Sequence, residues 1–140
     1  MKLKFLSSLL LAVALVVGAV ATPAVAGPSD PLFVNLLTDE AHRANMALSF
    51  SKGQFDQGHP LTIFLNDRGV MLASKANAAK FADHQKMLGE LVGKGAVILI
   101  CSMCMEHYGV KQADLIPGLK LATDLAGPAL FKDNTKTLTW

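Results

Sequence analysis

Both cysteines of the chain lie in one short segment, Cys101-Ser102-Met103-Cys104. This C-x-x-C spacing fits a redox pair, half of a metal site, a sulfur carrier or a structural disulfide. The alternative is that the two thiols simply pack in a core, since free cysteine is among the most buried residue types. His107 and Tyr108 follow at helical spacing. The position of the pair along the chain helps to choose among these interpretations.

The cysteines directly follow an unbroken apolar run, residues 96–100 (AVILI), which contains three β-branched residues. Such a run is typical of a strand that is buried on both faces of a parallel sheet. Cys101 would then lie at the carboxyl end of the sheet, where ligands and chemistry collect in open α/β folds. A helix that begins near Ser102 and ends at Gly109 would direct free N–H groups toward Cys101, and that environment favours the reactive thiolate.

The first 26 residues have the pattern of a secretory signal peptide. Lys2 and Lys4 form a basic start, an apolar core runs through residues 9–20, and Ala24-Val25-Ala26 provides a small-residue cleavage site before Gly27. An uncleaved N-terminal anchor is the alternative, but the apolar run is short for a membrane span. We therefore expect an exported, periplasmic protein that consists of one domain, residues 27–140, with no membrane attachment after cleavage.

The net charge and the expected compartment bear on the choice of partner and on the state of the cysteines. Lys2 and Lys4 are two of the 13 basic residues, and all 11 acidic residues follow the leader, so the mature chain has no formal net charge. No basic patch suggests a nucleic-acid partner.

Thiols outside the cytosol tend to be oxidised, which predicts a Cys101–Cys104 disulfide as the resting state. A bond that closes so short a loop stabilises a fold little, so reactivity is the better explanation for the pair.

The rest of the chain alternates between strand and helix patterns. These patterns predict an α/β fold with a mainly parallel five-stranded sheet and helices on both faces. Strands are expected at residues 32–37, 61–65, 96–100, 119–122 and 135–140. The helical stretches are a helix capped by Thr38 and ending within 53–58, a short helix or mobile flap at 75–80, and further helical segments at 81–92, 110–116 and 123–131.

Asp67 and Arg68 belong to a predicted loop, residues 66–70, at the carboxyl end of the second strand. If the strands are parallel, this loop shares an edge of the sheet with Cys101, and the two side chains would border the cysteine site together with His107 and Tyr108. The alternative for Asp67 and Arg68 is an ordinary turn. The sequence contains no glycine-rich phosphate loop, no G-x-S-x-G motif and no second metal half-site.

A metal-binding role is a second hypothesis for the same segment. Cys101, Met103, Cys104, Met105 and His107 place five soft or borderline ligands within seven residues, and thiolate and thioether ligands favour Cu(I). The alternative is that the two methionines pack against the sheet or a neighbouring subunit.

The order of these elements resembles the DsrE/DsrF-like family, including its YchN-like group. The resemblance rests on the first strand with its Ala-rich helix, on the stretch from Gly58 through Ile63-Phe64-Leu65 to Gly69-Val70, and on the segment 101–110 (CSMCMEHYGV). It implies a compact α/β fold and a homo-oligomer, a trimer or hexamer. It also implies that Cys101 corresponds to the cysteine on which family members carry persulfide sulfur. The chain has Tyr108 where the family often has Arg.

The leading hypothesis is therefore a sulfur carrier or thiol-transfer protein, similar to a sulfurtransferase and without a cofactor. Cys101 would accept a sulfane sulfur from a donor protein or molecule and pass it to an acceptor. Cys104 would resolve the persulfide by forming the disulfide and releasing sulfide. A third hypothesis is a non-catalytic subunit whose fold serves assembly, in which both cysteines are dispensable.

Overall fold

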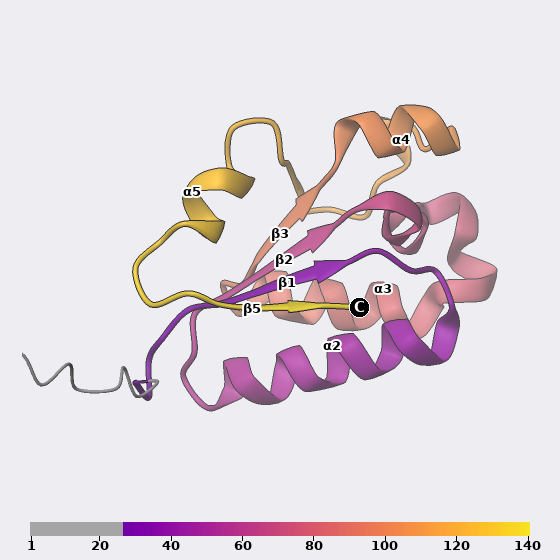
Figure 1. Cartoon of the computed structure of the whole chain (residues 1–140). Coiled ribbons are helices and arrows are strands. Elements are labelled where there is room, and N and C mark those ends of the chain that lie inside the picture. The colour runs from indigo at the N-terminus through magenta and orange to yellow at the C-terminus, as the bar shows by residue number, and fades with distance from the viewer. Residues whose placement is uncertain (1–26) are drawn as a thin grey trace, which may run out of the picture.

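The computed structural model describes residues 27–140, and these form a five-stranded, wholly parallel sheet in the order β4-β3-β2-β1-β5 (Figure 1). The strands are β1 (Leu32–Leu36), β2 (Leu61–Leu65), β3 (Val97–Ile100), β4 (Lys120–Leu121) and β5 (Lys136–Thr139). The predicted fold class, including the number of strands, is confirmed. The predicted signal peptide, residues 1–26, lies outside the described residues.

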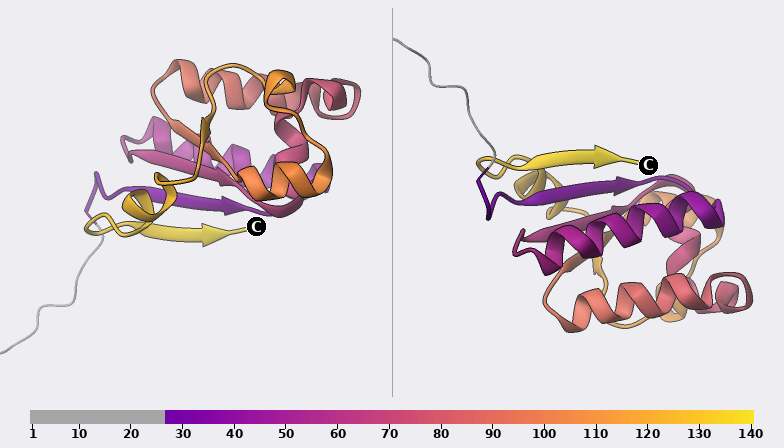
Figure 2. Two further views of the ribbon diagram at one scale, coloured as in Figure 1. Left: turned by 90° about the horizontal axis from the view of Figure 1, so that it is seen from above. Right: turned by 90° about the horizontal axis from the view of Figure 1, so that it is seen from below.

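Helices cover both faces of this sheet, as Figure 2 shows from two opposite sides. The α-helices are α2 (Ala41–Asp56), α3 (Ala78–Gly93), α4 (Ser102–Tyr108) and α5 (Ala126–Leu130). Helices α2 and α3 lie side by side on one face, while α4 and α5 lie on the other side of the sheet. Strands β2, β3 and β4 are added one after another on one side of β1, whereas β5 pairs with β1 on its other side. A right-handed connection in that reverse direction must cross the opposite face, which explains the position of α5.

The main core lies between the sheet and the α2–α3 face. Alternate residues of the strands point into it, among them Val34, Ile63 and Ile98, and all three are almost completely buried. Leu99 is also fully buried although it points to the other face, so the predicted two-sided burial of this strand is confirmed. Burial of each such side chain contributes about 1.5–3 kcal/mol, so β3 is one of the firmest supports for the cysteine segment that comes after it.

The first helix begins two residues later than predicted. Thr38 was the expected N-cap, but Glu40 has the extended backbone of a cap, and its carboxylate accepts the N–H groups of His42 and Arg43 at 3.0 and 2.8 Å. The hydroxyl of Thr38 accepts the N–H of Glu40 instead. The hydrogen bonds from Arg43 and His42 hold the pKa of Glu40 below its ordinary value.

The predicted loop at residues 66–70 is wrong, because a 3₁₀ helix, η1 (Asp67–Ala73), begins directly after Asn66. The side-chain oxygen of Asn66 caps it by accepting the N–H of Asp67 at 2.8 Å. Gly69 lets this helix approach the end of β1, since a Cβ at that position would lie 2.1 Å from the carbonyl oxygen of Leu36. The absence of a side chain therefore brings residues 66–73 against the sheet.

Of three further helical predictions, two need correction and one is confirmed. Residues 110–116 form only the single turn η3 (Gln112–Asp114), because the N–H groups of Val110 and Ile116 bond to Met105 and Ala73 rather than to helical partners. Residues 75–80 form the predicted short helical segment, in which the turn η2 (Lys75–Asn77) runs into the first residues of α3, and a kink at Phe81 (φ −123°, ψ 22°) separates this segment from the rest of that helix. The helix predicted at 123–131 is shorter, and Thr123 and Asp124 do not cap it.

None of the helices within residues 27–140 combines the length and apolar content needed to cross a bilayer.

Candidate functional site

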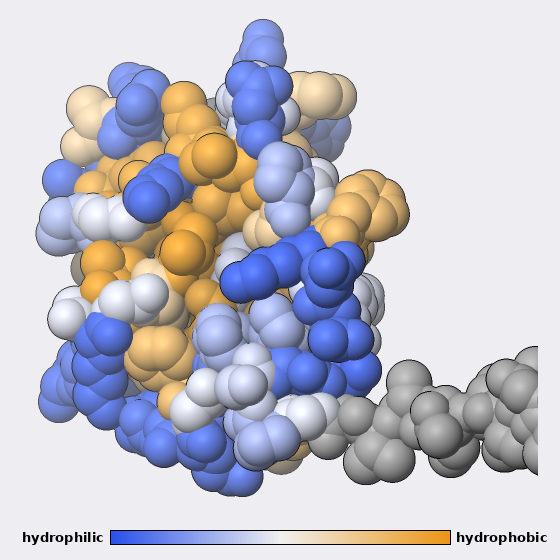
Figure 3. Space-filling view, turned by 90° about the vertical axis from the view of Figure 1, so that its left-hand side faces the viewer, coloured by the Kyte–Doolittle hydropathy of each residue, from blue (hydrophilic) through white to orange (hydrophobic). Residues whose placement is uncertain are grey.

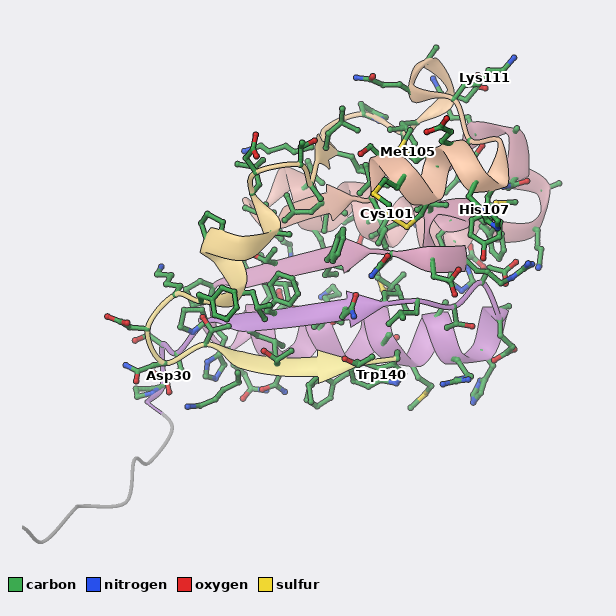
Figure 4. All side chains as sticks on the ribbon, turned by 45° about the horizontal axis from the view of Figure 1, so that its top comes forward. Asp30, Cys101, Met105, His107, Lys111 and Trp140 are labelled. Carbon is green, nitrogen blue, oxygen red and sulfur yellow. A yellow bond between two sulfur atoms is a disulfide. The ribbon has the colours of Figure 1, made fainter. Side chains whose placement is uncertain are left out.

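The cysteine pair lies where β3 ends and α4 begins (Figure 4). Cys101 is held to the neighbouring strand by its N–H, which donates to the carbonyl oxygen of Leu65 at 3.0 Å. It is also the N-cap of α4, because its Sγ accepts the N–H of Cys104 at 3.1 Å. The two side chains form the predicted disulfide, with 5.3 Å between their Cα atoms. The end of the strand thus positions the first cysteine and the first helical turn positions the second.

The two sulfur atoms have different polar neighbours. The Sγ of Cys101 faces an N–H donor, whereas the Sγ of Cys104 lies 3.1 Å from the side-chain oxygen of Asn66. The atom of Asn66 that faces this sulfur is the oxygen and not the amide nitrogen, because the same atom accepts the N–H of Asp67. A disulfide sulfur carries no proton, but after reduction the Cys104 thiol can donate to this oxygen. A donor favours the thiolate at Cys101 and an acceptor favours the thiol at Cys104.

Asn66 was not identified from the sequence as a site residue. Leu65 and Ile100 are register partners in the β2–β3 pair, so the next residues along the chain, Asn66 and Cys101, leave the sheet side by side. The sequence therefore held a clue to Asn66. The first polar residue after one strand lies next to the first polar residue after the neighbouring strand. It needed the strand register, which the sequence alone does not supply.

A polar network adjoins the pair. The hydroxyl of Tyr108 donates to the Asp67 carboxylate, and this bond raises the pKa of Tyr108 above its ordinary value of 10.0. Arg68 lies over the Tyr108 ring, with 5.7 Å from its guanidinium carbon to the ring centroid. The same guanidinium forms two hydrogen bonds to Asp39, at 2.7 and 2.9 Å, and holds the pKa of that carboxyl below its ordinary value. Asp67 and Arg68 therefore both contact the cysteine segment at Tyr108, Asp67 at the hydroxyl and Arg68 at the ring.

Two hollows open on the cysteine pair. One of about 400 Å³ is lined by Cys104 together with Asp67, Met103, His107 and Tyr108. The other, of about 220 Å³, is lined by Cys101 and a more apolar set: Phe64, Ser102, Met103, Ala122, Thr123 and Ala126. His107 packs edge-on against the Tyr108 ring at 4.7 Å between centroids. Each cysteine thus lines a hollow of its own.

The structure separates Met105 from the other four residues proposed as copper ligands. Met105 is 5% exposed and belongs to the main core, whereas Met103 is 79% exposed. Within residues 27–140, His, Cys, Asp and Glu side chains nowhere gather in a group of three or more that could hold a metal ion. The alternative that the methionines pack is right for Met105, which removes this residue from the proposed copper ligands.

A larger hollow, of about 460 Å³, lies at the opposite end of the sheet, by the amino ends of the strands. Figure 3 shows that end, where an apolar patch is rimmed by hydrophilic side chains. His59, Lys94 and Lys132 are among its lining residues, but neither cysteine is. Figure 4 shows the separation, with Asp30 at this end and Cys101 at the other. The larger hollow is therefore not the place where a thiol could react.

The comparison with known families supplies the context for this arrangement. Residues 32–132 match the DsrE/DsrF-like family, and this range contains strands β1 to β4 and the whole cysteine segment. The chain belongs to the DsrE/DsrF-like family. This family is associated with sulfur relay.

Individual relatives agree with that assignment. The chain is 36% identical over 98 residues to the uncharacterized protein MJ0989 of Methanocaldococcus jannaschii, a match that covers 68% of this chain and 86% of the relative. It is 32% identical over 95 residues to the uncharacterized protein MK0008 of Methanopyrus kandleri, which covers 66% and 78% of the two chains. Neither name assigns a function.

Solved structures with low sequence identity share the DsrE-like fold. A protein of unknown function from Methanobacterium thermoautotrophicum, MTH1491, superimposes with a TM-score of 0.63 at 14% identity and covers 79% of this chain and 98% of its own. The YchN protein of E. coli superimposes with a TM-score of 0.61 at 19% identity, covering 79% and 99%. At such identities the likeness concerns the fold and not the activity.

Proposed function

We propose that this DsrE-like protein is a sulfur carrier that holds a persulfide on Cys101 and uses Cys104 to resolve it. One observation carries the proposal: of the two sulfurs, Cys101 accepts an N–H hydrogen bond and Cys104 faces a carbonyl oxygen. When a donor faces one sulfur and an acceptor faces the other, the first is suited to attack as a thiolate and the second stays protonated. The family's association with sulfur relay supports the same choice.

The chemistry begins from the reduced pair. The Cys101 thiolate attacks the terminal sulfur of a persulfide or polysulfide donor, the donor's S–S bond breaks, and the remainder of the donor leaves as a thiolate. An acceptor thiolate can then take the outer sulfur and regenerate the Cys101 thiolate. If no acceptor comes, Cys104 loses its proton and attacks the Sγ of Cys101, which releases hydrosulfide and restores the disulfide.

Intact mass spectrometry of the reduced protein, before and after treatment with polysulfide, tests the proposal. We expect a gain of whole sulfur atoms that a reductant removes, that Cys101→Ser abolishes and that Cys104→Ser prolongs. Gln112→Ala is the control, because Gln112 is exposed and lines neither hollow at the cysteine pair. Loading retained in Cys101→Ser, or absent from the wild-type protein, would refute the assignment.

Export and self-association stay predictions. In the structure the N–H of Gly27 donates to the Asp30 carboxylate at 2.8 Å, and an α-ammonium group at Gly27 could make the same bond. We expect the secreted protein to begin at Gly27, which N-terminal sequencing of the periplasmic fraction would check.

Met103 and Phe131 are 79% and 83% exposed, and a second copy could cover such apolar side chains. Light scattering of wild-type and Phe131→Ser proteins would test the expected trimer or hexamer.

A further inference from the structure

The two hollows at the disulfide differ in which cysteine lines them. The hollow of about 400 Å³ is lined by Cys104 and not by Cys101, and the hollow of about 220 Å³ is lined by Cys101 and not by Cys104. A thiolate cleaves a disulfide by attacking one sulfur from the side opposite to the other, because the two sulfurs and the attacking atom lie in line. The larger hollow adjoins Cys104, the residue at which attack would expel Cys101.

The leaving sulfur points to the same direction of attack. Attack on Cys104 expels Cys101 as a thiolate, and that sulfur already accepts the Cys104 N–H at 3.1 Å. Attack on Cys101 would expel Cys104 as a thiolate 3.1 Å from the carbonyl oxygen of Asn66, which repels it. A thiolate that the protein stabilises leaves faster. The position of the larger hollow and the stability of the leaving group thus favour one sulfur over the other.

We propose that the thiol that reduces the resting disulfide attacks Cys104, and that Asn66 is the positioning residue that enforces this choice. The reductant's thiolate forms a new S–S bond to Cys104, the Cys101–Cys104 bond breaks, and Cys101 leaves as the thiolate. A second equivalent of thiol then attacks the reductant's sulfur in the mixed disulfide and frees Cys104, which takes up a proton. The proposal rests on the proposed function, since a carrier that rests as a disulfide must be reduced before Cys101 can take up sulfur.

The orientation of Asn66 is fixed by its own contacts. Its N–H donates to the carbonyl oxygen of Leu36 at 3.0 Å, and its side-chain oxygen accepts the N–H of Asp67. The oxygen is thus held against Cys104 by the end of β1 and the start of η1. This support explains how a residue that does not react can discriminate between two sulfurs three residues apart.

Trapping the first reduction step identifies the attacked sulfur. Oxidised protein is mixed with limiting 2-mercaptoethanol in the presence of excess iodoacetamide, then digested with trypsin, which releases residues 95–111 as one peptide. Fragment-ion spectra locate the carbamidomethyl group and the mercaptoethanol adduct. We expect the alkyl group on Cys101 and the adduct on Cys104, in about tenfold excess over the reverse product at high alkylating-agent concentration. An equal or reversed ratio would overturn the proposal.

Two substitutions at one position test the role of Asn66. Asn66→Ala removes the oxygen from Cys104 and should lower the product ratio roughly threefold, whereas Asn66→Asp replaces it with a charged oxygen and should raise the ratio. A residue that only supports the fold would move both ratios in the same direction or neither. Gln112→Ala should leave the ratio unchanged, because Gln112 is exposed and lines neither hollow. Because this measurement needs no sulfur donor, the direction of reduction can hold while sulfur loading fails, or the reverse.

Discussion

The hydroxyl of Tyr108 donates a hydrogen bond to the carboxylate of Asp67, and this bond joins the end of the cysteine helix to the start of η1. Asp67 has a positive φ of 45°, which is uncommon for a residue other than glycine. The bond therefore connects two segments that flank the reactive pair, 41 residues apart in the sequence. It also makes Tyr108 a reporter for the state of this edge of the sheet.

Tyr108 is the only tyrosine of the chain, so its ionisation can be followed directly by tyrosinate absorbance. The Asp67 bond raises the pKa of Tyr108 above 10.0. We expect Asp67→Ala to lower the absorbance midpoint toward 10.0. A midpoint that does not move would show that the bond is absent in solution.

The same bond predicts how stability depends on alkaline pH. Because the folded-state pKa of Tyr108 is raised, the stabilisation is fully present below pH 10.0 and is lost as the pH rises through the folded-state value. Urea unfolding of wild-type and Tyr108→Phe proteins should therefore differ at neutral pH and converge above that value. Parallel curves at all pH values would contradict this assignment.

The Asp39–Arg68 pair predicts the opposite pH dependence. The hydrogen bond from Arg68 lowers the pKa of Asp39 below 3.8, so its stabilisation is present above that value and is lost as the pH falls through the folded-state pKa. We expect Arg68→Gln to be less stable than wild type in urea at neutral pH and equally stable in strong acid. Lys80→Gln is the control, since Lys80 lies farther from Asp39, at 3.6 Å, and should have the smaller effect.

Gly69→Ala should strongly destabilise the protein. The new Cβ would lie 2.1 Å from the carbonyl oxygen of Leu36, so backbone must move, and we expect a loss of about 3 kcal/mol or more in the free energy of unfolding. Gly53→Ala is the matched control, because a Cβ there meets nothing within 4 Å in α2. That substitution should instead stabilise the protein by about 0.5–1 kcal/mol. Chemical unfolding of both variants checks the difference.

The two methionines of the cysteine segment should respond differently to truncation. Met105 is buried in the main core, so Met105→Ala should cost about 2–4 kcal/mol of stability and loosen α4. Met103 is 79% exposed, and Met103→Ala should change the free energy of unfolding by less than about 0.5 kcal/mol. Thermal unfolding by circular dichroism distinguishes the two. Equal losses would mean that Met103 is covered in solution, as it would be in an oligomer.

Much of this protein can be inferred from local sequence pattern. Strand β3 is recognisable because Val97, Ile98 and Ile100 belong to a continuous apolar run rich in β-branched residues, which is stable only when buried on both sides. The cysteines come directly after it, so their place at the carboxyl end of the sheet, and their disulfide, could be predicted from the sequence. These features depend on neighbours within a few residues, and hydrophobic periodicity reports such neighbours well.

The groups that meet the two sulfurs depend on the tertiary structure. Asn66 touches Cys104 across 38 residues because the register of β2 and β3 aligns their ends, and register depends on the packing of whole strands. The roles of Met103 and Met105 likewise depend on which face of α4 meets the core. The sequence determined the fold class and where the chemistry lies, because burial patterns are local. The polarity of the cysteine pair depends on long-range contacts, which local patterns do not encode.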